Sequence, residues 1–262
     1  MMPTMDNEII DCHVHPFLSE ENNTAWFPGT VSLDSFVSEL RKAGISKCCG
    51  SVIRRITKPT FDQIKTLNRE AIAYRNRYPD FFIPGIHVHP SYPDESCHEV
   101  EELYHNENVR WVGELVGYIL DHPSYLGEGM FKIYDLIQSL GLPVNIHPAA
   151  FAEMEVVCNN FPKMNVVIAH PTAKKDDILV RFEFIRKHPN AYLDISGSGL
   201  FRWGMLRHGI NVAGAHKFIF GTDFPITNPA MQVQGVLAEH LTDAEREAVF
   251  SGNFRRLTGL SG

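Results

Sequence analysis

Short apolar segments alternate with longer amphipathic segments along the whole chain. Eight of the apolar segments have the length and composition of buried strands. They span residues 9–12, 47–53, 81–87, 109–115, 143–146, 165–169, 191–195 and 217–220. Between them, apolar residues recur every three or four positions, which predicts helices that bury one face.

Several of these helices carry recognisable start signals. Ser32 is the expected N-cap of a helix that buries Phe36, Val37 and Leu40 and ends near Gly44. Thr242 and Glu245 form a capping box that opens a helix near the C-terminus. Further helices are expected over residues 60–78, 95–105, 129–140, 152–160, 175–187 and 200–212.

This alternation predicts a (β/α)8 TIM barrel formed by a single α/β domain over residues 1–262. Parallel strands need a helical crossover to return the chain, and eight strands is the number that closes such a barrel. A doubly wound open sheet would use the same alternation. The barrel is favoured because the count is eight and because many of the strands end in polar residues.

Composition narrows the class of protein. The net charge is −7, so the chain has no basic surface for nucleic acid or for an anionic membrane. Five cysteines without a C-x-x-C pair suit free thiols in a reducing compartment. Because the first eight residues are polar we expect no leader there, and no apolar run is long enough to span a membrane. We therefore expect a cytoplasmic protein that acts on a small molecule.

Two histidines at the end of the first strand form the strongest local motif. His13 and His15 follow the apolar residues Ile9 and Ile10, and Pro16 ends the pairing. Residues two apart on a strand point to the same side, so both imidazoles can address one ion. A His-x-His on a strand is also common by chance.

Three later strands repeat this design. His147 and His170 each follow an apolar run and precede a proline, and Asp223 ends the last strand in the same way. In a parallel barrel all these positions lie at the C-terminal rim, where TIM-barrel active sites are built. A single such residue could merely close a strand, but four strands with matched ligand types favour a metal site.

At this point the chain resembles the amidohydrolase superfamily, specifically its branch of small amidohydrolase-related proteins. The resemblance runs from Asp11 to the closing segment 252–257. It implies that His13 and His15 bind one metal with Asp223 beside it. It also implies that His147 is a ligand and that His170 binds either metal or substrate. Because dimers are common among such barrels, a homodimer is the assembly that it suggests.

The fourth strand bears on the number of ions, one or two. Many binuclear members of the superfamily carry a carboxylated lysine there, whereas this chain carries Glu114 at the end of an apolar run. A glutamate can bridge two cations, as in the TatD-like nucleases of the superfamily. The alternative is a glutamate that faces solvent or pairs with Arg110. A metal role is favoured because a charge among apolar neighbours is otherwise costly to bury.

The chemistry expected from this site is metal-dependent hydrolysis. Zinc is the expected ion, and it would activate water to attack a small carbonyl, ester, amide or lactone metabolite. Asp223 would accept the proton of that water, and His170 would polarise the group under attack. The alternative is non-oxidative decarboxylation of the aminocarboxymuconate semialdehyde decarboxylase type, because those enzymes carry a similar ligand set. A non-catalytic metal-binding protein is disfavoured because every expected ligand position is filled.

Other residues are weaker candidates. His87 and His89 form a second His-x-His, and one of them could contact substrate. Arg54 and Arg55 could hold a substrate carboxylate, and Trp26 and Phe27 could wall the pocket. His122, His188 and the small-residue turn 194–199 are expected to be structural.

Overall fold

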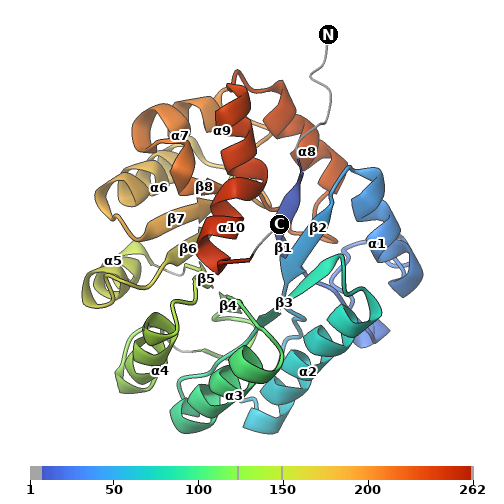
Figure 1. Cartoon of the computed structure of the whole chain (residues 1–262), viewed down its shortest axis with the longest axis vertical. Helices are drawn as coiled ribbons and strands as arrows, with labels where there is room; N and C mark the ends of the chain where they lie inside the picture. Colours follow the sequence, from blue (N-terminus) through green and yellow to red (C-terminus); the bar gives the residue numbers. More distant parts are fainter. Residues whose placement is uncertain (1–7, 123, 149, 261–262) are drawn as a thin grey trace.

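The computed structural model describes residues 8–122, 124–148 and 150–260, and its strands form one parallel sheet in the order β1 to β8 (Figure 1). The strands are β1 (Ile10–Val14), β2 (Lys47–Gly50), β3 (Phe82–Ile86), β4 (Trp111–Val116), β5 (Val144–His147), β6 (Val166–Ala169), β7 (Ala191–Asp194) and β8 (Phe218–Ile219). Each strand pairs with the next in parallel. The predicted strands are therefore all present, although most are shorter than expected.

The sheet closes where the last strand meets the first. Cys12 N donates to Phe220 O at 2.9 Å, and Val14 forms a parallel bridge with Phe224. Asp11 reinforces the closure, because its carboxylate accepts hydrogen bonds from the backbone and the hydroxyl of Thr222. The prediction of a (β/α)8 barrel is thus confirmed.

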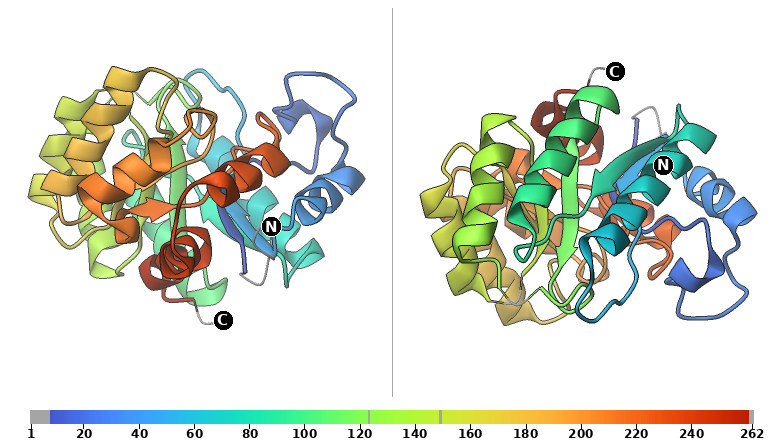
Figure 2. Two further views of the ribbon diagram at one scale, coloured as in Figure 1. Left: turned by 90° about the horizontal axis from the view of Figure 1, so that it is seen from above. Right: turned by 90° about the horizontal axis from the view of Figure 1, so that it is seen from below.

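Helices surround the strands on all sides (Figures 1 and 2). They are α1 (Leu33–Lys42), α2 (Phe61–Arg77), α3 (Pro93–Asn106), α4 (Glu128–Ser139), α5 (Phe151–Asn160), α6 (Lys175–Lys187), α7 (Met205–Ala213), α8 (Pro229–Ala238), α9 (Asp243–Glu247) and α10 (Asn253–Thr258). Short helical turns also occur as η1 (Glu20–Asn22), η2 (Ala215–Lys217) and η3 (Ala248–Gly252). The loop that contains η1, dark blue in Figure 2, stands out from the body of the barrel.

Two helices differ from the prediction. The helix expected from residue 200 begins only at Met205, because Gly204 before it adopts a left-handed conformation with φ 79°. The helix α8 was not expected, since its residues are apolar or uncharged and carry little amphipathic pattern. Its start is nevertheless encoded: Asn228 accepts hydrogen bonds from two backbone amides of the first turn, and Pro229 follows as the first helical residue.

Two apolar clusters stabilise the barrel. The larger lies between strands and helices, and the smaller joins the strands to α10. In the smaller cluster Trp111 of β4 packs on Phe254 of α10, with ring centroids 5.3 Å apart. The helix α10 therefore closes the N-terminal end of the barrel, where it lies over the strands in Figure 1. The opposite, C-terminal end is left for the candidate site.

Within the described residues, no helix is long and apolar enough to cross a membrane. The segment 1–7, for which no leader was expected, lies outside the described residues.

Candidate metal centre

The six residues singled out as a metal site come together at the C-terminal end of the barrel. His13 lies on β1 with His15 one residue beyond it, Glu114 lies on β4 and His147 ends β5. The remaining two, His170 and Asp223, follow β6 and β8. Their position agrees with the rim expected from the parallel barrel. That they bind metal remains a prediction.

Glu114 occupies the centre of this group. Its Oε2 lies 3.2 Å from His13 Nε2 and 3.6 Å from His15 Nε2. On the other side, its Oε1 lies 2.9 Å from His147 Nδ1 and 3.3 Å from His170 Nε2. Glu114 therefore faces four imidazoles, and the alternative of a solvent-facing side chain or an Arg110 pair is wrong.

Asp223 also lies beside His13 and His15. Its Oδ1 is 3.3 Å from His15 Nε2 and 3.7 Å from His13 Nε2. The two Nε2 atoms are themselves 3.2 Å apart. Ligand atoms of His13, His15 and Asp223 thus converge within the space of one ion, and so do those of His13, Glu114 and His170.

The chemistry of these donors fits a divalent cation. Burial alone would raise the pKa of Glu114, but the charge of His13 and hydrogen bonds from three imidazoles hold it well below its usual value. The pKa of His13 is raised well above its usual value: burial disfavours its charge, but Glu114 and Asp194 outweigh that effect. The buried carboxylates thus require positive charge among them, which histidine protons or a metal ion can supply.

The turn after β7 completes the site, and sequence reasoning had assigned it only a structural role. His13 Nδ1 lies 2.5 Å from Asp194 Oδ2, and both side chains are buried. Ser196 Oγ lies 3.0 Å from His170 Nδ1 and 3.2 Å from His13 Nδ1. These contacts take up the Nδ1 atoms and leave the Nε2 atoms to face the cluster. A polar Asp-x-Ser at a strand end, like those of the other site strands, was the available signal.

Gly197 lies in the same turn, at a position where a side chain would not fit. Its φ is 68°, and an added Cβ would lie 2.8 Å from His170 Nδ1. His170 and Asp223 also adopt left-handed conformations, with φ 64° and 68°. Such angles are unfavourable for residues other than glycine, and they cluster at functional sites. The amide of Asp223 donates to His13 O at 2.7 Å, which fixes this loop to β1.

A cavity of about 520 Å³ opens above the cluster. Five of the six candidate residues line it, His13 being deeper, and Asp223 is 7% exposed. The walls are largely apolar, with Trp26, Ile53, Val116, Tyr118, Ile119, Pro148 and Ile226, and they also include the polar residues Thr172, Arg181, Ser198 and Thr227. Such a cavity has the size of a small-molecule binding site.

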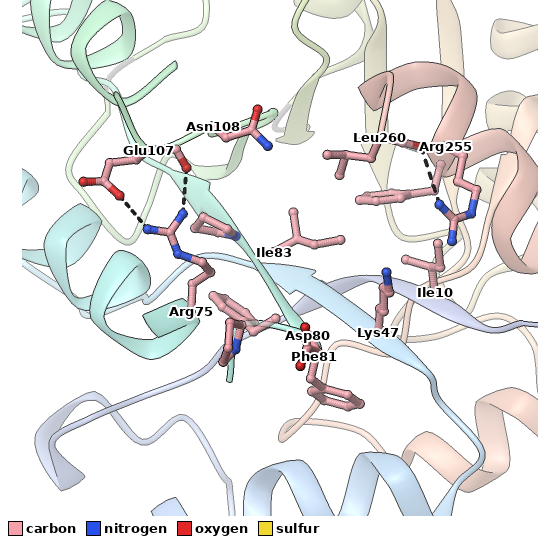
Figure 3. Close-up of a pocket in the computed structure, with 14 residues that line it drawn as sticks. Ile10, Lys47, Arg75, Asp80, Phe81, Ile83, Glu107, Asn108, Arg255 and Leu260 are labelled. Carbon is pink, nitrogen blue, oxygen red and sulfur yellow. Dashed lines mark hydrogen bonds and ion pairs between the residues drawn. The ribbon is translucent and has the colours of Figure 1, made fainter. Parts of the chain in front are cut away.

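A second cavity, of about 190 Å³, lies at the opposite end of the barrel (Figure 3). Arg75 and Arg255 line it, but they pair with Glu107 and Glu8. Ile10 and Lys47, the first residues of β1 and β2, line this cavity, so it lies at the N-terminal ends of the strands. None of the candidate metal ligands lines it, because they lie at the C-terminal ends.

The weaker candidates have other contacts. His87 Nε2 lies 2.8 Å from Val52 O, and His89 Nε2 lies 3.0 Å from Leu120 O. Neither residue lines the cavity above the cluster. Arg54 pairs with Glu21 at 2.9 Å, whereas Arg55 lies over the ring of Tyr118. His122 and His188 are buried away from the site, and Phe27 is exposed.

Comparisons with known proteins place this architecture among solved barrels. The 5-carboxyvanillate decarboxylase of Sphingomonas paucimobilis is 14% identical, with a TM-score of 0.71 over 98% of this chain and 100% of that one. A 2,6-dihydroxybenzoate decarboxylase from Rhizobium is 15% identical, with a TM-score of 0.74 over the same shares. A dihydroxybenzoic acid decarboxylase from Polaromonas, solved with manganese, is 17% identical, with a TM-score of 0.73 over 97% of each chain. A search of the curated proteins gave no match.

These similarities contradict the expectation of a hydrolase. The three solved structures named above are all decarboxylases. Non-oxidative decarboxylation was the alternative reaction considered from the sequence. The reason for the error is chemical: imidazoles and carboxylates around a cation suit both reactions, and the fold does not choose between them. The sequence itself matches the family model described as Amidohydrolase over residues 10–260, nearly the whole chain. The chain therefore belongs to the amidohydrolase family.

Proposed function

We propose that the chain is a metal-dependent decarboxylase that removes CO2 from an aromatic or otherwise conjugated carboxylic acid. The observation that carries the proposal is the cavity itself, in which a His/Glu/Asp cluster meets apolar walls. Planar substrates suit such walls, and a carboxylate suits the cation that the cluster would hold. The activities named for the similar solved structures support the same reaction class.

We further propose that the centre holds one ion. The two convergent donor groups share His13, whose Nδ1 is engaged by Asp194. Only its Nε2 is then free to bind metal, and one nitrogen lone pair binds one ion. His15, Glu114, His170 and Asp223 would supply the remaining ligands. His147 contributes through Glu114, with which it shares a hydrogen bond.

Manganese is our proposed ion in place of the zinc expected from the sequence. Two carboxylates beside the imidazoles suit Mn²⁺ as well as Zn²⁺. The Polaromonas structure, which was solved with manganese, supports the choice. When bound, the cation would supply positive charge that holds the substrate carboxylate and keeps it oriented.

The residues of this chain then account for the proton that decarboxylation requires. The carbon–carboxyl bond breaks, CO2 leaves, and the electron pair that remains takes up a proton at the same carbon. Asp223 is suited to deliver that proton, because it lines the cavity and its loop is fixed to β1. The apolar walls favour the release of neutral CO2 over the retention of a buried carboxylate. Solvent restores the proton of Asp223 afterwards.

The direct test is a substrate panel on protein reconstituted with Mn²⁺. Hydroxybenzoates and other conjugated acids would be assayed for CO2 release, and esters, lactones and amides for hydrolysis. We expect CO2 from at least one acid, dependence on the metal, and one deuterium at the vacated carbon in D2O. Metal-loaded protein that hydrolyses an ester or amide but releases no CO2 from any acid would refute the proposal.

A further inference from the structure

Arg181 contacts the segments that follow β5 and β6, the two strands whose ends present His147 and His170. It lies on α6, and its Nε donates to the backbone oxygen of His170 at 2.8 Å. Its guanidinium also lies over the ring of Phe151, 4.9 Å from the centroid. Phe151 is the first residue of α5, four residues after His147. One side chain therefore touches the segments that follow β5 and β6.

The contact with His170 meets a specific need. His170 adopts φ 64°, an unfavourable conformation for a residue with a side chain, so surrounding contacts must hold it there. Its ring is fixed from one side by Ser196. Arg181 fixes its backbone from the other side, with a charge-assisted hydrogen bond.

The contact with Phe151 is supported by a second residue of the same helix. Phe184, one turn after Arg181, meets the Phe151 ring edge-on at 5.1 Å. Arg181 is itself held to its own helix, because Nη1 donates to Asp177 O at 3.1 Å. The helix α6 thus forms a rigid support against which the start of α5 is packed.

Arg181 is not explained as an ordinary surface charge. It is partly buried and lines the catalytic cavity. Within the described residues it has no carboxylate oxygen at ion-pair distance, unlike Arg186 one turn and a half later, which pairs with Glu183. A guanidinium held in this way exchanges solvation for a backbone oxygen and a ring face, which favours a positioning role.

We propose that Arg181 is a positioning residue of the metal centre. It acts through the backbone of His170 and through Phe151, and so keeps His147 and His170 directed toward Glu114. Arg181 thereby affects the affinity of the centre for a metal ion and the geometry of the metal ligands. This role rests on the proposed metal site but not on the reaction, so it can fail without refuting decarboxylation.

The test is titration of Mn²⁺ alone into metal-free protein, with no substrate present. Arg181→Gln should bind Mn²⁺ about 10- to 100-fold more weakly than wild type, the range seen when partners of metal ligands are removed. Arg181→Lys keeps a donor for the His170 oxygen but not the planar stack, so an intermediate loss is expected. Arg186→Gln, on the exposed side of the same helix, is the matched control and should bind like wild type.

A second measurement separates positioning from general stability. The absorption spectrum of the Co²⁺-loaded protein reports ligand geometry, and it should change in Arg181→Gln even at saturating Co²⁺. Phe151→Leu should weaken Mn²⁺ binding as well, and its effect should not add fully to that of Arg181→Lys. Unchanged Mn²⁺ affinity and an unchanged Co²⁺ spectrum in Arg181→Gln, with only a lower melting temperature, would overturn the proposal.

Discussion

Asp194 Oδ2 lies 2.5 Å from His13 Nδ1 in the most buried part of the centre. Burial alone would raise the pKa of Asp194, but the charge of His13 and the hydrogen bond between them lower it. An ionised Asp194 accepts a hydrogen bond from the Nδ1–H group of His13 and so fixes the tautomer in which Nε2 is free. The contact joins the last residue of β7 to the histidine of β1, with β8 between the two strands.

Replacement of Asp194 tests this relationship. We expect Asp194→Asn to weaken Mn²⁺ binding about 10- to 100-fold, because the amide no longer fixes the His13 tautomer or raises its basicity. Metal content after dialysis against a graded chelator series measures the effect. Asp135→Asn, at an exposed position on α4, is the control and should keep wild-type affinity. Equal affinities in both variants would contradict a tuning role for Asp194.

The number of ions per chain tests the role of His13 Nε2 as a shared ligand. We expect elemental analysis of the reconstituted protein to give one divalent ion per chain. Glu114→Gln should lower the affinity for that ion without changing the stoichiometry at saturation. About two ions in wild type, falling to one in the variant, would instead show that Glu114 bridges two cations, as the sequence alone allowed.

Much of this architecture was predictable because each strand carries its own signal. His13, His147, His170 and Asp223 each end an apolar run, and parallel strands bring such ends to one rim. Glu114 followed from the same logic. The helix α8 was missed because its residues are apolar or uncharged, so no amphipathic pattern marks it, even though Asn228 and Pro229 mark its start.

Asp194 and Arg181 were harder to predict, for different reasons. Asp194 lies 181 residues from His13 in the sequence, and a strand-end aspartate before serine and glycine also reads as a turn. Arg181 acts through a backbone oxygen, which leaves no side-chain pattern. The reaction was predicted wrongly because one ligand set serves two chemistries, and the walls that distinguish substrates come from loops without motifs.

His87 should make metal-free protein sensitive to acid. Burial lowers its pKa from 6.5 to about 4, although a hydrogen bond to Val52 O raises it slightly. The unfolded chain therefore takes up this proton first, so stability present above pH 6.5 is lost as the pH falls toward 4. The loss amounts to about 3 kcal/mol at most. His87→Gln keeps a donor but cannot titrate.

Urea unfolding at pH 7 and pH 4.5 measures the difference. The free energy of unfolding should fall less for His87→Gln than for wild type over this interval, whatever the cost of the substitution at pH 7. His105→Gln, at an exposed position near the end of α3, is the control, and its free energy of unfolding should fall between the two pH values as much as that of wild type. An equal fall in the free energy of unfolding for all three proteins would show that His87 does not titrate as its burial implies.

Tyr118 should contribute to substrate binding more than to chemistry. Tyr118 is 59% exposed and lines the cavity, and its ring meets that of His147 edge-on with centroids 5.5 Å apart. A flat substrate could pack against this ring, at a gain of about 1 kcal/mol. We expect Tyr118→Ala to raise KM for an active acid by about fivefold, with a much smaller change in kcat. Tyr118→Phe should leave KM close to wild type, and a loss as large as that of the alanine variant would assign the effect to the hydroxyl.

Asp223 should determine the rate of the chemical step. Removal of a positioned proton donor lowers rates by about 10²- to 10⁴-fold. We therefore expect Asp223→Asn to lose that factor in kcat when assayed at saturating Mn²⁺. Because Asp223 is also a proposed ligand, its Mn²⁺ affinity must be measured first, so that every assay is made with the metal bound.

The kcat of Asp223→Asn saturated with Mn²⁺ separates the two roles of Asp223. Wild type should show a solvent isotope effect on kcat and should form product with one deuterium at the vacated carbon in D2O, and the variant should lose most of its kcat if Asp223 delivers the proton. Glu153→Gln, which removes a carboxylate from α5 outside the cavity lining, should keep both features. If Asp223→Asn retained wild-type kcat once saturated with Mn²⁺, Asp223 would be a ligand only. The proton would then have to come from another group in the cavity, and His170 is a candidate because it also lines the cavity.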